Sequence, residues 1–348
     1  MFLCMGMIRY LFLFLVTFSS GCRKSDTNIP SVQYTASEVQ DNSFISDAAN
    51  WAGKEALIST RFTTFEELKT VVDIQYLENI PMKIRSRSVK NEVRLTHRSG
   101  DREVISILKS GVSQTDFLKA REGNLWDQLK LGLKCPYAVI NKRDLKIIEN
   151  LGRRKPWCYG KGDVAFYDLA ETMVANIMAA DTIHMQPKDL TEKGYLNTFN
   201  HITAQAFMTS AFSEQTADFV ADVHELYNMP ELITGKFSEA QLTNLSEGPV
   251  DNYIDLINNE WGQELGKVLA EKYNLTRLTL WTPALLASYL NDIQTYHSWC
   301  FQIGFYPYKE TDEVVVRFVN KVNDLKKGGY KECVRSKTSE RHMRSFPN

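Results

Sequence analysis

Seven polar residues occupy three otherwise apolar segments, and their side chains could together do chemistry. They are Asn200 and His201, His224 and Glu225, and Asp255, Asn258 and Asn259. Imidazole, carboxylate and amide groups can hold a divalent cation, or they can form an acid/base pair with groups that orient it. We expect His201, Glu225 and Asp255 to be catalytic and the other four residues to bind. Hydrolysis is the simplest reaction for such a set, and the identity of any metal stays open.

The same residues allow two interpretations. In a hydrolase, Glu225 or His201 would be the general base, while Asp255 and Asn259 would position a metal ion or a water molecule. In a structural protein, the same side chains would form a buried polar network that fixes the register of three packed helices, with aspartate and histidine satisfying each other. The residue types alone leave both interpretations open.

The third group has the spacing of one helix face. Asp255, Asn258 and Asn259 stand at positions i, i+3 and i+4, and Gly262 continues the same face. Because glycine costs about 1 kcal/mol of helix propensity relative to alanine, its presence predicts the close approach of another backbone. The three polar groups would therefore meet if their helices pack face to face.

Several familiar catalytic patterns do not occur in the chain. His224-Glu225 lacks the second histidine of the zinc-protease motif His-Glu-x-x-His, because position 228 is Asn228. The sequence also contains no Gly-x-Ser-x-Gly, no phosphate-binding glycine loop and no dinucleotide-binding fingerprint. These absences disfavour a zinc protease of that type, a serine hydrolase with a nucleophile elbow and a nucleotide-binding enzyme.

The order and spacing of the motifs resemble an uncharacterised bacterial domain family, found in secreted proteins and at the ends of large toxin-like polypeptides. In that family Arg-His or Asn-His precedes His-Glu, and Asp-Leu-x-Asn-Asn-x-x-Gly follows on a third helix. The matching segment covers roughly residues 165–275. The chain has Asn200 where arginine is usual and Gln263 where arginine is frequent, so two cations are missing. The resemblance implies the helices and the motif residues, and it implies no particular reaction.

The elements that would position these motifs are helical. Between Asp163 and Asp292 apolar residues recur at three- and four-residue spacing, which predicts helices over 166–180, 196–212, 213–227 and 253–273. Ser213 is a predicted helix cap, and Thr282-Pro283 predicts the start of a fifth helix through residue 290. The segment over 314–322 fits a helix or a strand. The expected fold class is therefore mainly α, with a helical bundle domain over residues 163–310.

A smaller mixed α+β region is expected over residues 45–160. Thr64 and Glu67 have capping-box spacing, and apolar residues through Ile74 predict a helix after them. Alternation over 92–97 and 103–108 predicts a hairpin, and a short helix is expected from Lys142. A Gly/Pro breaker places the domain boundary near 155–163. Residues 311–348 form a C-terminal segment with a basic tail.

The N-terminus has the pattern of a bacterial lipoprotein. Residues 1–21 combine Arg9, a short apolar run and small residues before Cys22, so they predict a signal peptide and a lipidated cysteine. Residues 22–44 are polar and predict a tether. The expected location is the bacterial cell envelope, as an outer-membrane lipoprotein that faces the periplasm or the exterior and is bound to the membrane by its lipid. Alternatives are an ordinary signal peptide with an incidental cysteine and a short N-terminal helix.

Four cysteines remain once Cys4 leaves with the signal and Cys22 is acylated: Cys135, Cys158, Cys300 and Cys333. Of the three connectivities that four cysteines allow, Cys135 to Cys158 and Cys300 to Cys333 closes the shortest loops. The alternative is buried free thiols.

The charge balance of the chain is nearly neutral. Lysine and arginine total 41, against 42 for aspartate and glutamate. Such a balance gives no electrostatic footprint for a nucleic acid, so we expect no nucleic-acid partner. The expected function is that of a lipid-anchored envelope protein that acts as a metal-assisted or acid/base hydrolase, and the alternative is a non-catalytic binding or structural lipoprotein.

Overall fold

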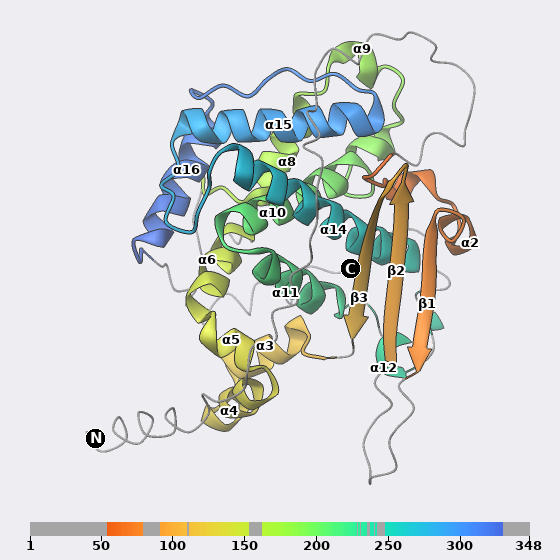
Figure 1. Ribbon diagram of the computed structural model, residues 1–348, viewed down its shortest axis with the longest axis vertical. Helices are drawn as coiled ribbons and strands as arrows, with labels where there is room; N and C mark the ends of the chain where they lie inside the picture. The colour runs from red at the N-terminus through yellow and green to blue at the C-terminus, as the bar shows by residue number, and fades with distance from the viewer. Residues whose placement is uncertain are drawn as a thin grey trace, which may run out of the picture. The chain divides into compact units, whose positions relative to one another are not determined.

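The structure confirms a mainly α fold with a smaller α+β region (Figure 1). The computed structural model describes residues 54–78, 91–109, 111–152, 162–227, 229, 231–234, 237–239, 241 and 248–329. The predicted signal peptide, Cys22, the tether, Cys158, Cys333 and the basic tail lie outside these residues. In the described part, no helix combines the length and the hydropathy that a membrane crossing needs.

The helical part contains helices at the positions that the hydrophobic spacing predicts, but the helix predicted over 166–180 ends at Ala175 and the helix predicted through residue 290 runs to Phe301. Its longer helices are α6 (Lys142–Gly152), α8 (Phe166–Ala175), α10 (Tyr195–Ala211), α11 (Glu214–Glu225), α14 (Pro249–Lys272), α15 (Pro283–Phe301) and α16 (Glu313–Lys326). Short helical turns lie between them: α9 (Ala179–Thr182), η4 (Pro187–Leu190) and α12 (Glu231–Thr234). The ambiguous segment over 314–322 is thus helical.

The two predicted helix caps are present. The Ser213 hydroxyl accepts a hydrogen bond from the Thr216 backbone N–H at 3.1 Å, and Thr282 accepts one from Leu285 N–H at 3.1 Å. Each cap satisfies a backbone donor that the first turn of a helix leaves unpaired. The helix after Thr282 runs on to Phe301, well past the predicted end at residue 290, and stops at Gln302, which has a left-handed φ of 57°.

A three-stranded antiparallel sheet has the order β1 (Val72–Glu78), β2 (Asn91–Ser99) and β3 (Arg102–Lys109). The predicted hairpin is confirmed as β2 and β3, which turn through Gly100 at a φ of 63°. A short N-terminal segment, η3 (Ser59–Arg61), precedes the sheet.

The predicted helix through Ile74 is wrong beyond its first turn. Thr64 does cap a helix, since its hydroxyl accepts the Glu67 N–H at 3.1 Å, but α2 (Phe65–Leu68) ends there. Val72 and Ile74 instead belong to β1, where Val72 pairs with His97 of β2. Their spacing fits either element, and the ladder to β2 decides in favour of a strand, which β-branched residues suit.

The centre of the fold is the packing of α10 along α14, where glycine allows the two backbones to approach. A methyl group at Gly262 would lie 2.8 Å from Gln205 Cβ and 3.0 Å from the Ile202 carbonyl oxygen. One turn on, a methyl group at Gly266 would lie 2.6 Å from the Ala206 carbonyl oxygen. The close approach that Gly262 predicts is confirmed, and it places the polar faces of α10 and α14 against each other.

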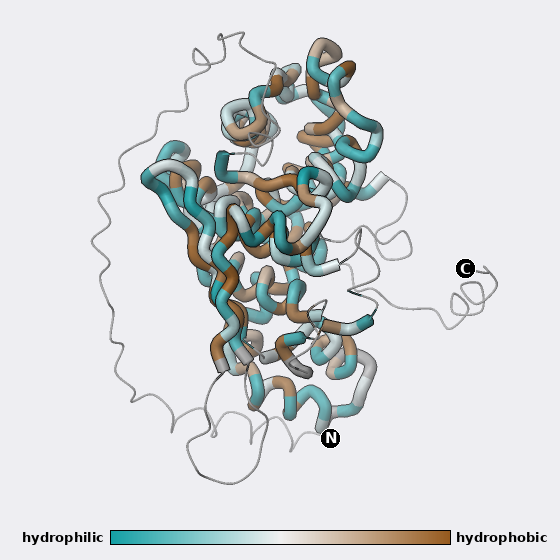
Figure 2. The backbone as a smooth tube through the Cα atoms, turned by 90° about the vertical axis from the view of Figure 1, so that its right-hand side faces the viewer, coloured by the Kyte–Doolittle hydropathy of each residue, from teal (hydrophilic) through white to brown (hydrophobic). Residues whose placement is uncertain are grey.

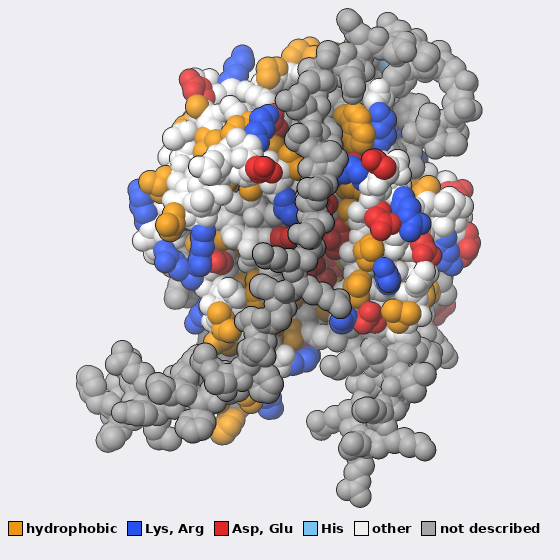
Figure 3. All heavy atoms as spheres, in the orientation of Figure 1, with side chains coloured by type: hydrophobic (Ala, Val, Ile, Leu, Met, Phe, Trp, Pro, Cys, Tyr) orange, Lys and Arg blue, Asp and Glu red, His pale blue; other side chains and the backbone are white. Residues whose placement is uncertain are grey.

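The sheet lies against α14, and the two regions share one hydrophobic core. The Trp261 indole N–H donates to His97 Nδ1 of β2 at 2.9 Å, and Arg102 of β3 lies over the same indole, 5.2 Å from the ring centroid. Figure 2 shows hydrophobic residues alternating with hydrophilic ones along the strands, as a sheet with one buried face requires. Basic and acidic side chains are interspersed over the face seen in Figure 3.

Three further helices, α3 (Gln114–Glu122), α4 (Leu125–Lys134) and α5 (Pro136–Ile140), follow the sheet in the chain. They lie together beside α6 and α11 (Figure 1). Cys135 at the start of α5 and Cys300 in α15 are buried, and neither is bonded to another described cysteine. Burial raises the pKa of the Cys300 thiol to about 12, so this sulfur is protonated at neutral pH. Because Cys158 and Cys333 are outside the described residues, the disulfide pairing stays a prediction.

Candidate functional site

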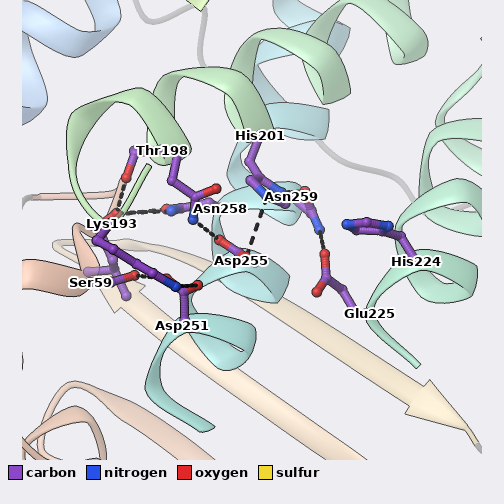
Figure 4. A network of polar contacts seen from close by, with 12 residues as sticks. Ser59, Lys193, Thr198, His201, His224, Glu225, Asp251, Asp255, Asn258 and Asn259 are labelled. Atoms are coloured by element: carbon purple, nitrogen blue, oxygen red, sulfur yellow. Dashed lines mark hydrogen bonds and ion pairs between the residues drawn. The ribbon is translucent and has the colours of Figure 1, made fainter. Parts of the chain in front are cut away.

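Three helices bring His201, Glu225 and Asp255 together (Figure 4). His201 lies in the middle of α10, Glu225 is the last residue of α11, and Asp255 lies in the first half of α14. One donor atom from each of the three lies within 4.8 Å of the other two. Asn259, one turn after Asp255, lies between the imidazole and Glu225. The convergence that the motif order predicts is therefore present in the fold.

The asparagine orients the imidazole. His201 Nδ1 is 2.9 Å from Asn259 Oδ1, and the Asn259 amide N–H points toward Glu225 Oε1 at 3.5 Å. With the amide in this orientation, its oxygen faces Nδ1, so Nδ1 carries the hydrogen and donates it. Nε2 then presents its lone pair toward Asp255 Oδ2, 3.4 Å away. Two lone pairs facing each other at this distance need a proton or a cation between them.

Glu225 is an acid kept largely protonated near neutral pH. Its residue is 1% exposed, and burial raises the pKa of its carboxyl to about 8, with a further rise from the charge of Asp255. The His201 imidazole and the Asn259 amide act in the opposite direction. No lysine or arginine in the described part of the chain forms an ion pair with Glu225, so its charge lacks a counter-ion there.

Asp255 is similarly short of positive charge. Burial, followed by the charge of Asp251 one turn earlier, raises the pKa of Asp255 well above its usual value, while the Asn197 amide lowers it by donating to Oδ1 at 2.8 Å. Lys193 is 3.5 Å from the Asp251 carboxylate and acts on Asp255 only from a distance. Two buried carboxyls beside one imidazole form a site that a divalent cation would neutralise.

A pocket of about 860 Å³ opens over this cluster. His201, Glu225 and Asn259 line it, whereas Asp255 lies behind them. The pocket is enclosed by α10, α11 and α14 on the side of the cluster and by α3 to α6 on the other side. Its volume lies within the range of natural small-molecule sites, about 300–1,000 Å³. The pocket thus reaches His201, Glu225 and Asn259, of which Glu225 and Asn259 are only 1% and 2% exposed.

The remaining motif residues lie at different distances from the cluster. Asn200 is half-buried and lines the pocket. His224 is exposed at the pocket, its ring centroid is 6.5 Å from that of His201, and its Nδ1 is 3.2 Å from Gln114 Oε1 of α3. In Figure 4 its ring extends from α11 toward Asn259 and Glu225.

Asn258 is separate from the site. Its side chain is fully buried, accepts the Leu57 N–H at 2.8 Å and donates to the Leu57 carbonyl oxygen at 2.9 Å. Thr198 of α10 donates to the same carbonyl at 2.8 Å. These contacts hold the chain before the sheet against α10 and α14, which is a structural role.

Sequence reasoning overlooked Asn197 and Lys193. Asn197 stands four residues before His201, so it shares the His201 face of α10 and could have been found from that spacing. Lys193 precedes the helix, and no pattern in the sequence connects it with Asp251.

The donor set suits a divalent cation. Two ligands at about 2.0–2.1 Å from one tetrahedral ion lie about 3.4 Å apart, and this is the distance from His201 Nε2 to Asp255 Oδ2. The second imidazole nitrogen is held by a carbonyl-type oxygen, as in most histidines that bind a metal. His201 and Asp255 therefore fit a cation, with Glu225 beside it at the pocket.

Comparisons of the chain with protein-family models, with curated proteins and with solved structures found no match. The resemblance of the site motifs to the bacterial domain family therefore stays a prediction.

Proposed function

We propose that this chain is a metal-dependent hydrolase of the bacterial cell envelope, attached to the membrane through a lipid on Cys22. The observation that carries the proposal is the convergence of His201 Nε2 and the two buried carboxyls at the floor of a large pocket. In this arrangement His201 and Asp255 hold a divalent cation, and Asn259 keeps the imidazole in the tautomer that binds it.

Glu225 is the general base in this proposal. It lines the pocket, whereas Asp255 does not, so a water molecule at the cation would lie within its reach. Without a cation, a pKa of about 8 leaves Glu225 mostly protonated at neutral pH, and the charge of a bound cation would favour the carboxylate form that accepts a proton. A bound cation would polarise the water and the scissile carbonyl or phosphoryl group. Glu225 would take the proton from the water and return it to the leaving group.

The competing function is a non-catalytic lipoprotein in which the same residues hold the helix bundle together. Asn258 has such a role. The His201 cluster differs because its carboxyls face each other without a lysine or arginine partner among the described residues and because it opens into a pocket.

The test is cation binding and hydrolysis by the full chain after removal of metals with a chelator. Calorimetric titration with Mn²⁺ and Zn²⁺ should show one site in the wild type. Asp255→Asn should weaken binding by more than about 100-fold, because changes outside the ligand shell alone cost 10–100-fold. Asp251→Asn makes the same chemical change one turn earlier on α14, outside the cluster, and should keep the site.

Glu225→Gln separates binding from catalysis. It should still bind the cation but lose hydrolysis of a panel of chromogenic ester, amide and phosphoester substrates, which the wild type should cleave in a cation-dependent way. If the wild type binds no divalent cation, or if Glu225→Gln hydrolyses as fast as the wild type, the proposal is wrong.

A further inference from the structure

The helix α4 presents an apolar face to solvent. Trp126, Leu129 and Leu133 stand at i, i+3 and i+7, and they are 71%, 48% and 84% exposed. On the neighbouring α5, Val139 and Ile140 are also exposed. Scattered exposed apolar residues are ordinary, but five large ones on two helices that contact each other are more than scatter, and we call these five residues the apolar patch. Such a concentration usually marks an interaction site.

This apolar patch continues into the pocket. Gln128, Leu131 and Gly132, on the next face of α4, line the pocket that contains His201 and Glu225. Val139 belongs both to the exposed patch and to the pocket lining. The α4–α5 hairpin therefore forms one wall of the site and also its outer apolar surface, so whatever covers the patch lies next to the pocket.

The charges around the patch fit an anionic partner. Lys130 and Lys134 follow the apolar residues on α4 and are exposed, with Lys134 also 3.2 Å from Asp116. Lys142 and Lys146 of α6 line the pocket together with Glu149. A helix with tryptophan and leucine on one face and lysine beside them is typical of a segment that lies in a membrane interface.

The interior of the pocket is mostly apolar. Side chains that line it include Phe117, Leu118, Leu145, Ile148, Phe166 and Phe219. The polar groups described above are at the floor, on α10, α11 and α14. A ligand that fills this pocket thus has an apolar body and places one polar linkage at the His201 cluster.

We propose that the apolar face of α4 and α5 docks on an anionic lipid surface, and that the pocket takes up the acyl chain of an amphiphile from that surface. The assignment of the amphiphile as substrate rests on the proposed hydrolase function, whereas the docking does not. In the reaction, water adds to the acyl carbon, the bond from that carbon to oxygen or nitrogen breaks, and the leaving group takes the proton that Glu225 removed from the water.

The docking is tested by tryptophan fluorescence of the full chain on vesicles of phosphatidylcholine and phosphatidylglycerol with brominated acyl chains. Bromine quenches only tryptophan that reaches the acyl layer. The wild type should be quenched, and Trp126→Phe should remove most of the quenched component. Trp299→Phe, which changes a half-buried tryptophan on α15, should leave the quenching unchanged. Equal quenching in Trp126→Phe and the wild type would overturn the proposal.

A pair of leucine variants provides a matched control. Leu133 and Leu278 are 84% and 87% exposed, but only Leu133 belongs to the patch. Leu133→Asp should raise the lipid concentration needed for half-maximal quenching of Trp126 about tenfold, because burial of one leucine side chain changes a binding constant by at least that factor. Leu278→Asp should leave this concentration unchanged. The same loss in both variants would contradict docking through α4.

Uptake of an acyl chain is measured separately, by titration of the cation-loaded chain with palmitate. The wild type should bind palmitate, and Ala138→Trp, which narrows the pocket, should lose it while the cation stoichiometry stays at the wild-type value. If the wild type binds the cation but not palmitate, the acyl substrate is wrong and the hydrolase proposal survives. If it binds palmitate and vesicles but no cation, the hydrolase proposal fails and the lipid surface survives.

Discussion

Asn258 and Asn259 are neighbours on α14, and they do opposite things. Asn258 is sealed from solvent and pairs donor for acceptor with the backbone of Leu57. Asn259 faces the pocket and connects His201 with Glu225. The first arrangement satisfies every polar group that it buries, and the second leaves two carboxyls without a cation among the described residues. An unbalanced polar cluster at a pocket is the more informative sign of function.

The buried glutamates show the same contrast. Glu55 is 1% exposed and pairs with Arg102 at 2.7 Å, and its pKa is raised to about 7 by burial that Arg102 partly offsets. Glu225 is equally buried, but the like charge of Asp255 raises the pKa of Glu225 further. A paired carboxylate stabilises its surroundings, whereas an unpaired one is stabilised by a proton or by a cation.

The largest effect is expected from Asn258→Ala, which tests the difference between Asn258 and Asn259. This change leaves the buried Leu57 N–H without a partner, while the Leu57 carbonyl keeps Thr198. The free energy of unfolding should fall by about 3 kcal/mol, as measured by urea denaturation. Asn259→Ala should cost less than about half of that, since its partners can reach water in the pocket. If the two variants are equally destabilised, the difference between the two asparagines is not real.

The pH dependence of stability sharpens the contrast between the glutamates. Glu225 has a pKa of about 8 in the folded state, against 4.5 as its ordinary value. Between these values the folded chain holds a proton that the unfolded chain has lost, so stability falls as the pH rises from about 4.5 to 8, by at most about 1.4 kcal/mol per pH unit.

Glu225→Gln should flatten this fall, and a divalent cation held by His201 and Asp255 should reduce it in the wild type, because a positive charge beside Glu225 favours its carboxylate form. Unfolding curves of both chains over this pH range measure the difference. Asp222 and Glu260 also have pKa values raised to about 8 by burial, so the wild type should keep some slope that the variant shares. Parallel curves for the two chains would exclude a raised Glu225 pKa.

Gly262→Ala tests how the fold positions the site. Its added methyl group would meet Gln205 and Ile202 of α10, which should separate the helices that carry His201 and Asp255. We expect a loss of about 1–2 kcal/mol in stability together with weaker cation binding. Gly152→Ala, at the end of α6, has no atom within 4 Å of the added methyl group and should be neutral or slightly stabilising. Cation affinity unchanged in Gly262→Ala would show that the helix approach does not set the site.

The smallest expected effect belongs to His224→Ala. This imidazole is exposed and lies beside the cluster without joining it. Stability should change by less than about 0.5 kcal/mol, and the cation affinity should stay within a few-fold of the wild type. Loss of the cation in His224→Ala would move this histidine into the ligand set.

The sequence predicts the helices of the site well, because their apolar spacing, caps and the glycine on α14 all indicate the same arrangement. It does not distinguish Asn258 from Asn259, since both fall on the predicted polar face. Their roles are decided by Leu57, a residue 201 positions earlier whose backbone packs against α14. The prediction of a helix at Val72 is wrong for a similar reason, because the pairing of Val72 with His97 in another strand overrides a local helical pattern.

The sequence does not predict the exposed apolar face of α4 either. Only the structure shows that Trp126, Leu129 and Leu133 of α4 are exposed.

The central claim is that the His201 cluster binds a cation and does not serve to hold the fold together. Thermal unfolding of the wild type and Asp255→Asn, each with chelator and with Mn²⁺ at pH 8, tests it most directly. With chelator the two should melt within a few degrees of each other, because the carboxamide keeps the Asn197 contact without a buried charge. Mn²⁺ should raise the melting temperature of the wild type only, as a ligand of the folded state does. A large loss of stability in Asp255→Asn with no response of the wild type to Mn²⁺ would contradict the account.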